Sequence, residues 1–429
     1  MTVAPGTVLA QIGPGFAGLS YEKSHMQDGF FRGDNTALIA MLRLLGPSVL
    51  RIGANAVDRT TWESAGGPAS TTITKAEVDG FAALIKAAGW SAIYGVNMKT
   101  SMPSYAADEA AYAAADLGTN LYGFEIGNEP DLYPSSVVSS YGDFTTKWES
   151  FFSAMRAGGA GPNAAFTGPA SAANYDSWTV PFASDEASNI TLLTQHYYRA
   201  NGQDPSSTLD LLLQPDPNLV NELKALSAAA KANNIANAYR CAECNSFYNG
   251  GAAGVSDEYG TALWGVDFLF TNAQYGASGV NFHGGNNVYT PIADANGAVV
   301  AAHPLFYGML VFSLAGTGAM LGTQVSVPNV NFTAYAVKPG DGSTNVVLVN
   351  KDASNGVQAS VDMGAAVGSA SAIYLQAPSL DATSGITLGG AGVTPTGTWS
   401  PNPPYAVSSS GNNVAVLVPP GSIALVHVK

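Results

Sequence analysis

The first three-quarters of the chain alternates short runs of β-branched and aromatic residues with longer segments whose apolar positions recur every three or four residues. Such short runs are typical of buried strands, and the longer segments of amphipathic helices. The expected strands are residues 17–22, 48–55, 91–98, 121–128, 164–170, 190–198, 238–245 and 278–285. Eight strand–helix units in this length predict an α/β fold of the (β/α)8 TIM-barrel type. A doubly wound sheet is the main alternative, but no Gly-x-Gly-x-x-Gly turn follows the first strand.

Several of the intervening helices carry start and stop signals. Thr74 and Glu77 form a capping box, and Gly89 is expected to end that helix. A second helix begins with Asp216 as N-cap and Pro217 at its first position. A third is expected at 142–159.

From about residue 320 the helical pattern disappears and short alternating strands follow, separated by turns such as PGDGS (339–343) and SGNN (410–413). This pattern predicts an antiparallel β-sandwich. The N-terminal segment TVLAQI is expected to add a strand to it, because 17–22 already supplies the first barrel strand. We therefore expect the barrel at 13–318 and a sandwich domain made of 1–12 plus 319–429.

The charge of the chain narrows the class of partner. Net charge is −14, from 31 acidic and 17 basic residues, which disfavours nucleic acid and an anionic membrane surface. No apolar run is long enough for a transmembrane helix, and the N-terminus lacks the features of a secretory signal. The low lysine content nevertheless favours a secreted or periplasmic protein, and we expect a monomer.

Strand four ends in FEIGNEP, which contains a candidate catalytic carboxyl group. Strand alternation places Glu125, Gly127 and Glu129 on one face and Asn128 on the other. Because barrel active sites lie at the C-terminal ends of strands, Glu129 can project into the mouth as a general acid or base. The alternative is a charged residue that merely ends a strand in a turn.

Strand seven contains YRCAECN, which holds both cysteines and a second glutamate. Alternation places Cys241 below Glu243 on one face, with Arg240 and Cys244 on the other. A redox or metal role for the two thiols is disfavoured, because redox CxxC motifs usually open a helix and no second CxxC completes a zinc site. Glu243 is then the functional residue of the segment.

Carboxylates at the ends of strands four and seven lie on opposite sides of a barrel mouth. Glycoside hydrolysis uses such a pair, in which one carboxylic acid protonates the leaving oxygen and the other attacks the sugar. A retaining mechanism needs the two groups about 5–5.5 Å apart. It requires neither a metal ion nor an organic cofactor.

Four segments together resemble glycoside hydrolase family 79, which contains bacterial β-glucuronidases and heparanase. They are LRIGAN (50–55), GFEIGNEPD (123–131), the E-x-N-S of 243–246 and FHGGNNVY (282–289). The resemblance covers essentially the whole chain, including a β-sandwich with a strand from the N-terminus. It implies that Glu129 is the acid/base, Glu243 the nucleophile, Asn128 a contact of the sugar 2-hydroxyl, and Tyr198 a hydrogen-bond partner of the nucleophile.

A glucuronide also carries a carboxylate that an acidic protein must bind. The resemblance implies main-chain amides of a Gly-rich loop after strand eight, at Gly284 and Gly285, assisted by Tyr289 and Tyr248. The alternative for the two glycines is a simple turn. Lys99 is a further candidate cation for the substrate, although a place on the rim is the alternative, and Asn55 is a candidate sugar contact.

These observations favour a retaining exo-β-glucuronidase that removes terminal β-linked glucuronic acid from glucuronides or glycan chains. The same two glutamates would also serve a xylosidase, an arabinofuranosidase or a glucosidase. An endo-acting, heparanase-like enzyme is disfavoured, because 17 basic residues are few for a cleft that binds sulfated chains. A carbohydrate-binding protein on a degraded barrel is the non-enzymatic alternative.

Overall fold

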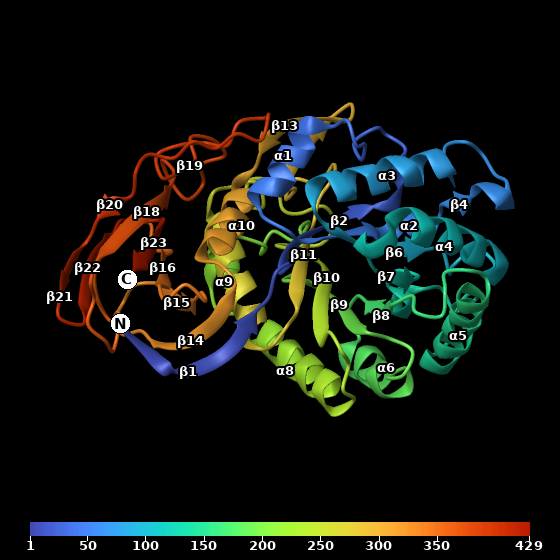
Figure 1. Ribbon diagram of the computed structural model, residues 1–429, viewed down its shortest axis with the longest axis horizontal. Coiled ribbons are helices and arrows are strands. Elements are labelled where there is room, and N and C mark those ends of the chain that lie inside the picture. Colours follow the sequence, from blue (N-terminus) through green and yellow to red (C-terminus); the bar gives the residue numbers. More distant parts are fainter.

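The computed structural model describes all 429 residues and contains a closed barrel beside a curled antiparallel sheet (Figure 1). The barrel strands, in chain order, are β2 (Ala17–Glu22), β3 (Val49–Gly53), β6 (Ser91–Val96), β7 (Leu121–Ile126), β8 (Phe166–Ser171), β9 (Leu192–Tyr198), β10 (Tyr239–Asn245) and β11 (Gly279–His283). All eight pair in parallel and close between β11 and β2. The predicted (β/α)8 barrel is confirmed.

Helices cover the outside of the barrel (Figure 1). They are α1 (Thr36–Leu44), α2 (Ala54–Val57), α3 (Lys75–Ala88), α4 (Pro103–Leu117), α5 (Tyr141–Ala157), α6 (Val180–Asp185), α7 (Leu209–Leu213), α8 (Pro217–Ala232), α9 (Gly260–Gln274) and α10 (Pro304–Ala315). The capping signals act as expected: α3 has the capping box of Thr74 and Glu77, and Gly89 ends it at φ 71°. The side chain of Asp216 caps α8. None of the helices is both long and apolar enough to span a membrane.

Two short sheets lie outside the barrel and were not anticipated from the sequence. One pairs β4 (Thr61–Trp62) with β5 (Thr72–Ile73), and the other is the hairpin of β12 (Ile292–Ala295) and β13 (Ala298–Ala302). The hairpin interrupts the connection from β11 to α10. It gives the barrel mouth an extra element after its last strand.

The second β structure is one eleven-stranded sheet that curls over its own core. Its strands are β1 (Thr2–Ile12), β14 (Gly318–Gln324), β15 (Phe332–Lys338), β16 (Thr344–Asn350), β17 (Val357–Asp362), β18 (Ala370–Gln376), β19 (Thr387–Leu388), β20 (Tyr405–Ala406), β21 (Ser408–Ser410), β22 (Asn413–Val418) and β23 (Ser422–Val428). Strand β1 pairs with β14 on one side and touches β17 on the other, so it joins the two halves. The sheet matches the predicted sandwich, and its core contains a cluster of 17 buried apolar side chains.

The sheet is attached to the barrel through α9 and α10, which lie between the two β structures in Figure 1. The rings of Phe270 on α9 and Tyr335 on β15 stack with centroids 4.4 Å apart. Lys351 forms an ion pair with Asp267, and the Tyr335 hydroxyl donates to the same carboxylate at 2.9 Å. Apolar packing and a shared polar contact therefore fix the sheet against the barrel.

The strand alternation expected for β10 is wrong, because this strand contains a bulge. Cys241 pairs with Gln195 on β9 but Glu243 pairs with the next residue, His196, so one extra residue is inserted. Arg240 contacts Asn281, whose amide reaches the Val49 carbonyl on the non-adjacent strand β3. Arg240 and Glu243 therefore both point into the barrel, although they were expected on opposite faces.

The alternation expected at the end of β7 is wrong as well. The strand ends at Ile126, two residues earlier than predicted. Gly127 has φ 85° and Glu129 has φ 48°, so both lie in the left-handed region and the chain turns sharply between them. Because of this turn, Glu129 lines the cavity at the barrel mouth and Asn128 lies buried behind it.

Candidate active site

A cavity of about 560 Å³ opens at the C-terminal ends of the barrel strands. Its volume is in the range of small-molecule sites. The lining residues are Glu22, Asn55, Glu129, Leu132, Ala172, Ala173, Tyr198, Glu243, Tyr248, Asn249, Gly250, His283, Asn287 and Tyr289. Both predicted catalytic glutamates are among them.

Glu243 is buried at the end of β10 and is surrounded by hydrogen-bond donors. Arg51 Nη1 lies 2.8 Å from Glu243 Oε2, and the Tyr198 hydroxyl donates to Glu243 Oε1 at 2.9 Å. Burial by itself would raise the pKa of Glu243, but the charges of His283, His196 and Arg51 and the Tyr198 hydrogen bond outweigh it and lower the pKa to about 2. Glu243 is therefore an anion at any ordinary pH, as a nucleophile requires.

Glu129 lies across the mouth, in the turn after β7. His196 Nδ1 is 3.0 Å from Glu129 Oε1, and the Glu129 side chain keeps 18% of its surface exposed. One oxygen of Glu129, one oxygen of Glu243 and a ring nitrogen of His196 all lie within 4.8 Å of one another. The two carboxyl groups are thus close enough to act on the same bond.

Arg51, on β3, connects the parts of the site from below. Its Nε lies 2.5 Å from Glu125 Oε1, and its Nη2 donates to Asn128 Oδ1 at 2.8 Å. Together with the bond to Glu243, the planar guanidinium fixes three groups, from β7, from the turn after β7 and from β10. The side chains of Arg51 and Glu125 have no exposed surface, so this ion pair sets the geometry of the mouth rather than meeting solvent.

Four of the predicted substrate-binding residues line the cavity: Asn55, Tyr198, Tyr248 and Tyr289. Asn128 lies just behind them, where its Nδ2 is 3.4 Å from Asn55 Oδ1.

Three other predicted residues do not line the cavity. The ammonium of Lys99 is 3.5 Å from Asp58 and lies over the Tyr133 ring, so Lys99 belongs to the rim. Side-chain atoms at Gly284 and Gly285 would collide with Tyr21 and His25, which shows that these glycines allow close packing behind the cavity.

Several lining residues escaped the sequence reasoning. Glu22 ends β2 and His283 ends β11, and their side chains lie 4.0 Å apart. Burial raises the pKa of Glu22. Both residues are polar groups at the ends of barrel strands, so the rule that selected Glu129 would also have selected them. Arg51 and His196 gave no comparable signal, because their role depends on contacts across the barrel.

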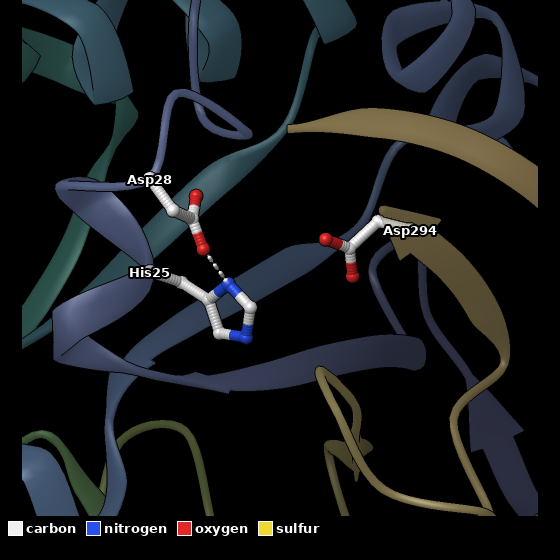
Figure 2. A group of neighbouring side chains, drawn as sticks. All are labelled: His25, Asp28 and Asp294. Atoms are coloured by element: carbon white, nitrogen blue, oxygen red, sulfur yellow. Dashed lines mark ion pairs between the residues drawn. The ribbon is translucent and has the colours of Figure 1, made fainter. Parts of the chain in front are cut away.

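Two groups of imidazole and carboxylate side chains are close enough to be considered as metal ligands. One is Glu129, His196 and Glu243 in the cavity. The other is His25, Asp28 and Asp294, which joins the segment after β2 to the β12–β13 hairpin (Figure 2). In each group a ring nitrogen, Nδ1, already faces a carboxylate oxygen. Both groups are therefore built around a contact between an imidazole and a carboxylate.

The two cysteines are free and buried below the mouth. The Cys241 thiol lies 3.7 Å from the Glu243 carbonyl oxygen, and the Cys244 thiol 3.4 Å from that of Asn281. Burial and the neighbouring Cys241 thiol raise the pKa of Cys244. The thiols are thus neighbours rather than on opposite faces, which is a second consequence of the bulge in β10.

A (β/α)8 barrel with a pair of carboxyl groups at its mouth is typical of glycoside hydrolases. Comparison with known proteins identifies which of these enzymes the chain resembles. A sequence profile of the glycosyl hydrolase family 79 C-terminal beta domain matches residues 334–425. A β-glucuronidase of Aspergillus niger is 27% identical over 54% of this chain, and one of Neurospora crassa is 28% identical over 40%. The matched segments span 48% and 34% of those two proteins. The resemblance to family 79 seen in the sequence is confirmed.

Solved structures agree with the fold. A 4-O-α-L-rhamnosyl-β-D-glucuronidase from Fusarium oxysporum superposes with a TM-score of 0.83 over 99% of this chain and 100% of its own, at 18% identity. An α-L-arabinofuranosidase from Thermotoga maritima superposes with a TM-score of 0.73 over 100% of this chain and 99% of its own, at 15% identity. At these identities the likeness shows the shared architecture of barrel and curled sheet.

Proposed function

We propose that the protein is a retaining, exo-acting β-glucuronidase. The observation that carries the proposal is the short separation of two glutamates across one cavity, with an oxygen of Glu129 and an oxygen of Glu243 within 4.8 Å. Retaining glycosidases place their carboxyl groups about 5–5.5 Å apart, whereas inverting enzymes leave about 6.5–9.5 Å for a water molecule. The spacing here supports direct attack on the sugar.

In the first step Glu129 gives its proton to the glycosidic oxygen while Glu243 attacks the anomeric carbon. Arg51 and Tyr198 hold the attacking carboxylate in place, and His196 orients Glu129. The aglycone leaves with the proton, and the sugar remains bound to Glu243 as an ester. In the second step Glu129 takes a proton from water, which displaces Glu243 and restores the β configuration.

The side of the cavity formed after β10 supports an acidic sugar. The backbone N–H groups of Asn249 and Gly250 donate to no acceptor within the protein, and both residues line the cavity. Asn249, Gly250 and Gly251 have φ values of 63°, 83° and 93°. Successive N–H groups in such turns form concave sites for anions. In this proposal they receive the glucuronate carboxylate, in place of the expected Gly284 and Gly285.

The neighbouring side chains support a bound sugar ring. Glu22, Asn55, His283 and Asn287 supply carboxylate, amide and imidazole groups at the ends of β2, β3 and β11. Hydroxyl groups need such donors and acceptors. A cavity of about 560 Å³ accommodates a terminal sugar and the group attached to it, which favours exo action.

The test is a panel of aryl β-glycosides with the product anomer followed by NMR. The β-glucuronide should be hydrolysed with the β anomer formed first, and the matching β-glucoside and β-xyloside should be poor substrates. An α anomer as first product would refute the retaining mechanism. Faster hydrolysis of the glucoside or xyloside would refute the choice of sugar while leaving the two-glutamate mechanism intact.

A further inference from the structure

One wall of the cavity differs from the rest in being apolar. It is formed by Leu132, three residues after Glu129, and by Ala172 and Ala173 after β8. Leu132 is 59% exposed, so its side chain is open to a bound group. The opposite side, from β10 through β11 and β2, carries Glu22, His283 and Asn287.

This apolar wall is held in a fixed shape by Asp131, the residue before Leu132. The Asp131 carboxylate accepts from the backbone N–H of Ala172 at 2.9 Å, of Ala173 at 3.1 Å and of Asn174 at 3.2 Å. The side-chain amide of Asn174 donates to it as well, at 3.0 Å. One carboxylate therefore ties the turn that carries Glu129 to the loop after β8, and the wall is preorganised.

The cavity offers no lysine or arginine to an anionic group. None of its 14 lining residues is lysine or arginine, and three are glutamates. The neighbouring cations are already engaged, Arg51 with Glu125 and Glu243 and Lys99 with Asp58. A sulfated or carboxylated group on the wall beside Glu129 would meet carboxylates without a partner of its own.

The position of the wall follows from the chemistry of the acid. Glu129 must reach the oxygen of the departing group, so that group lies on the Glu129 side of the cavity. We infer that Leu132, Ala172 and Ala173 form a binding subsite for an uncharged aglycone that presents a flat apolar face. An aromatic ring has such a face, and so does a neutral sugar. The inference rests on the proposed glucuronidase function and specifies its substrate class.

The experiment compares kcat/KM for methyl β-glucuronide, phenyl β-glucuronide and β-glucuronyl-galactose in the wild type and in Leu132→Ser. Each substrate is compared with itself, so differences in leaving-group ability cancel. We expect the phenyl glucuronide to lose about fivefold more than the methyl glucuronide, since it loses an apolar contact. If neutral sugars bind in the subsite, kcat/KM for β-glucuronyl-galactose should fall as much as that for phenyl β-glucuronide. If only aromatic groups bind there, it should fall as little as that for methyl β-glucuronide.

Leu417→Ser is the matched control, because Leu417 on β22 is 56% exposed and far from the mouth. It should not change the ratio between substrates. A second variant tests the charge argument: Leu132→Arg should raise kcat/KM for a sulfonated phenyl glucuronide relative to phenyl glucuronide.

Two results would overturn the inference. If Leu132→Ser lowers kcat/KM equally for the methyl and phenyl glucuronides, the apolar subsite is refuted and the proposed glucuronidase function stands. If the wild type hydrolyses none of the glucuronides, both the subsite and the proposed function are refuted.

Discussion

The barrel mouth and the interior of the curled sheet are both enclosed by β-strands, but they are filled differently. The interior of the sheet is packed with apolar side chains, among them Val346, Leu348 and Val416, and it buries no charged pair comparable to those of the barrel mouth. The mouth of the barrel buries Arg51, Glu125, His196 and Glu243. Apolar filling stabilises a fold directly, whereas burying charges costs free energy unless each one is paired.

The buried charges in the barrel mouth are paired with one another around Glu243. Arg51 faces two carboxylates, and one of them, Glu243, also receives the Tyr198 hydroxyl and opens onto the cavity. A sheet core of similar burial needs no such network. The difference indicates that the mouth gives up stability in order to hold the Glu243 carboxylate in a fixed position. Substitutions in the two regions should therefore affect different quantities.

The largest expected effect is on turnover, from Glu243→Gln. Without the nucleophile, kcat on an aryl β-glucuronide should fall by roughly 10³-fold or more, while thermal unfolding still shows a folded protein. Glu222→Gln is the matched control. Glu222 is a buried glutamate on α8 whose pKa is raised by burial, so the neutral amide resembles it and activity should be kept. Near-wild-type turnover in Glu243→Gln would contradict the assignment.

Glu129→Gln should reduce activity in a way that depends on the leaving group. General acid catalysis contributes about 10²–10⁴-fold, so kcat/KM for methyl β-glucuronide should fall by about that factor. Dinitrophenyl β-glucuronide needs little protonation and should lose far less in its first step. Added azide should then yield the β-glucuronyl azide. Losses of equal size for both substrates would argue against Glu129 as the acid.

Arg51→Lys should lower kcat/KM by about tenfold and change its pH dependence, because a lysine cannot replace the fork of the guanidinium. With Arg51 present the pKa of Glu243 is about 2, so the nucleophile is ionised throughout the usual pH range. A weaker cation raises that pKa, so activity in the variant should be lost at a higher pH as the solution is acidified. Arg199→Lys, a rim residue paired with Asp216, should leave this acid limb unchanged.

The same pKa predicts how folding stability varies with pH. Because the pKa of Glu243 is lower in the folded protein than in the unfolded chain, its contribution is present above the unfolded value of about 4.5 and is lost as the pH falls towards 2. As the pH is lowered from about 4.5 towards 2, the free energy of unfolding of the wild type should therefore fall relative to that of Glu243→Gln. A difference that stays constant between pH 5 and pH 2 would contradict the lowered pKa.

In the sheet, Leu348→Ala should lower the free energy of unfolding by about 2–5 kcal/mol, because it leaves a cavity in a well-packed core. Its kcat/KM should match the wild type at temperatures where the variant is folded. Leu417→Ala, on the exposed face of the same sheet, should change stability by no more than about 0.5 kcal/mol. A loss of activity in folded Leu348→Ala would show that the two regions are coupled.

The smallest effect is expected from Cys241→Ser and Cys244→Ser. Both thiols are buried beside backbone carbonyl oxygens, to which a serine hydroxyl can donate in the same place. We expect kcat/KM to remain within about threefold of the wild type, consistent with a ΔΔG of under about 1 kcal/mol. Loss of turnover comparable to that of Glu243→Gln would mean that the thiols take part in the chemistry.

Comparing the sequence with the structure shows which signals were local. The strands of the barrel, the caps of α3 and α8 and the alternation of the sheet strands were all predicted, because each depends on residues within one turn or one strand. The two glutamates were found as polar residues at strand ends, and their roles came from the resemblance to a family. Predictions failed where strand alternation was extended through the bulge in β10 and the turn at Gly127.

By itself, the sequence determined the architecture, the two carboxyl groups and the side of the barrel on which they lie, since periodicity and capping are properties of neighbouring residues. Only the tertiary structure decided that Arg51 holds Glu243, a contact across 192 residues of chain. It also decided that Asn249 and Gly250, whose backbone N–H groups have no acceptor in the protein, line the cavity, whereas Gly284 and Gly285 do not. Such contacts form only when the barrel closes. Closure brings together strand ends that are far apart in the sequence, and their separation along the chain does not predict which of them will touch.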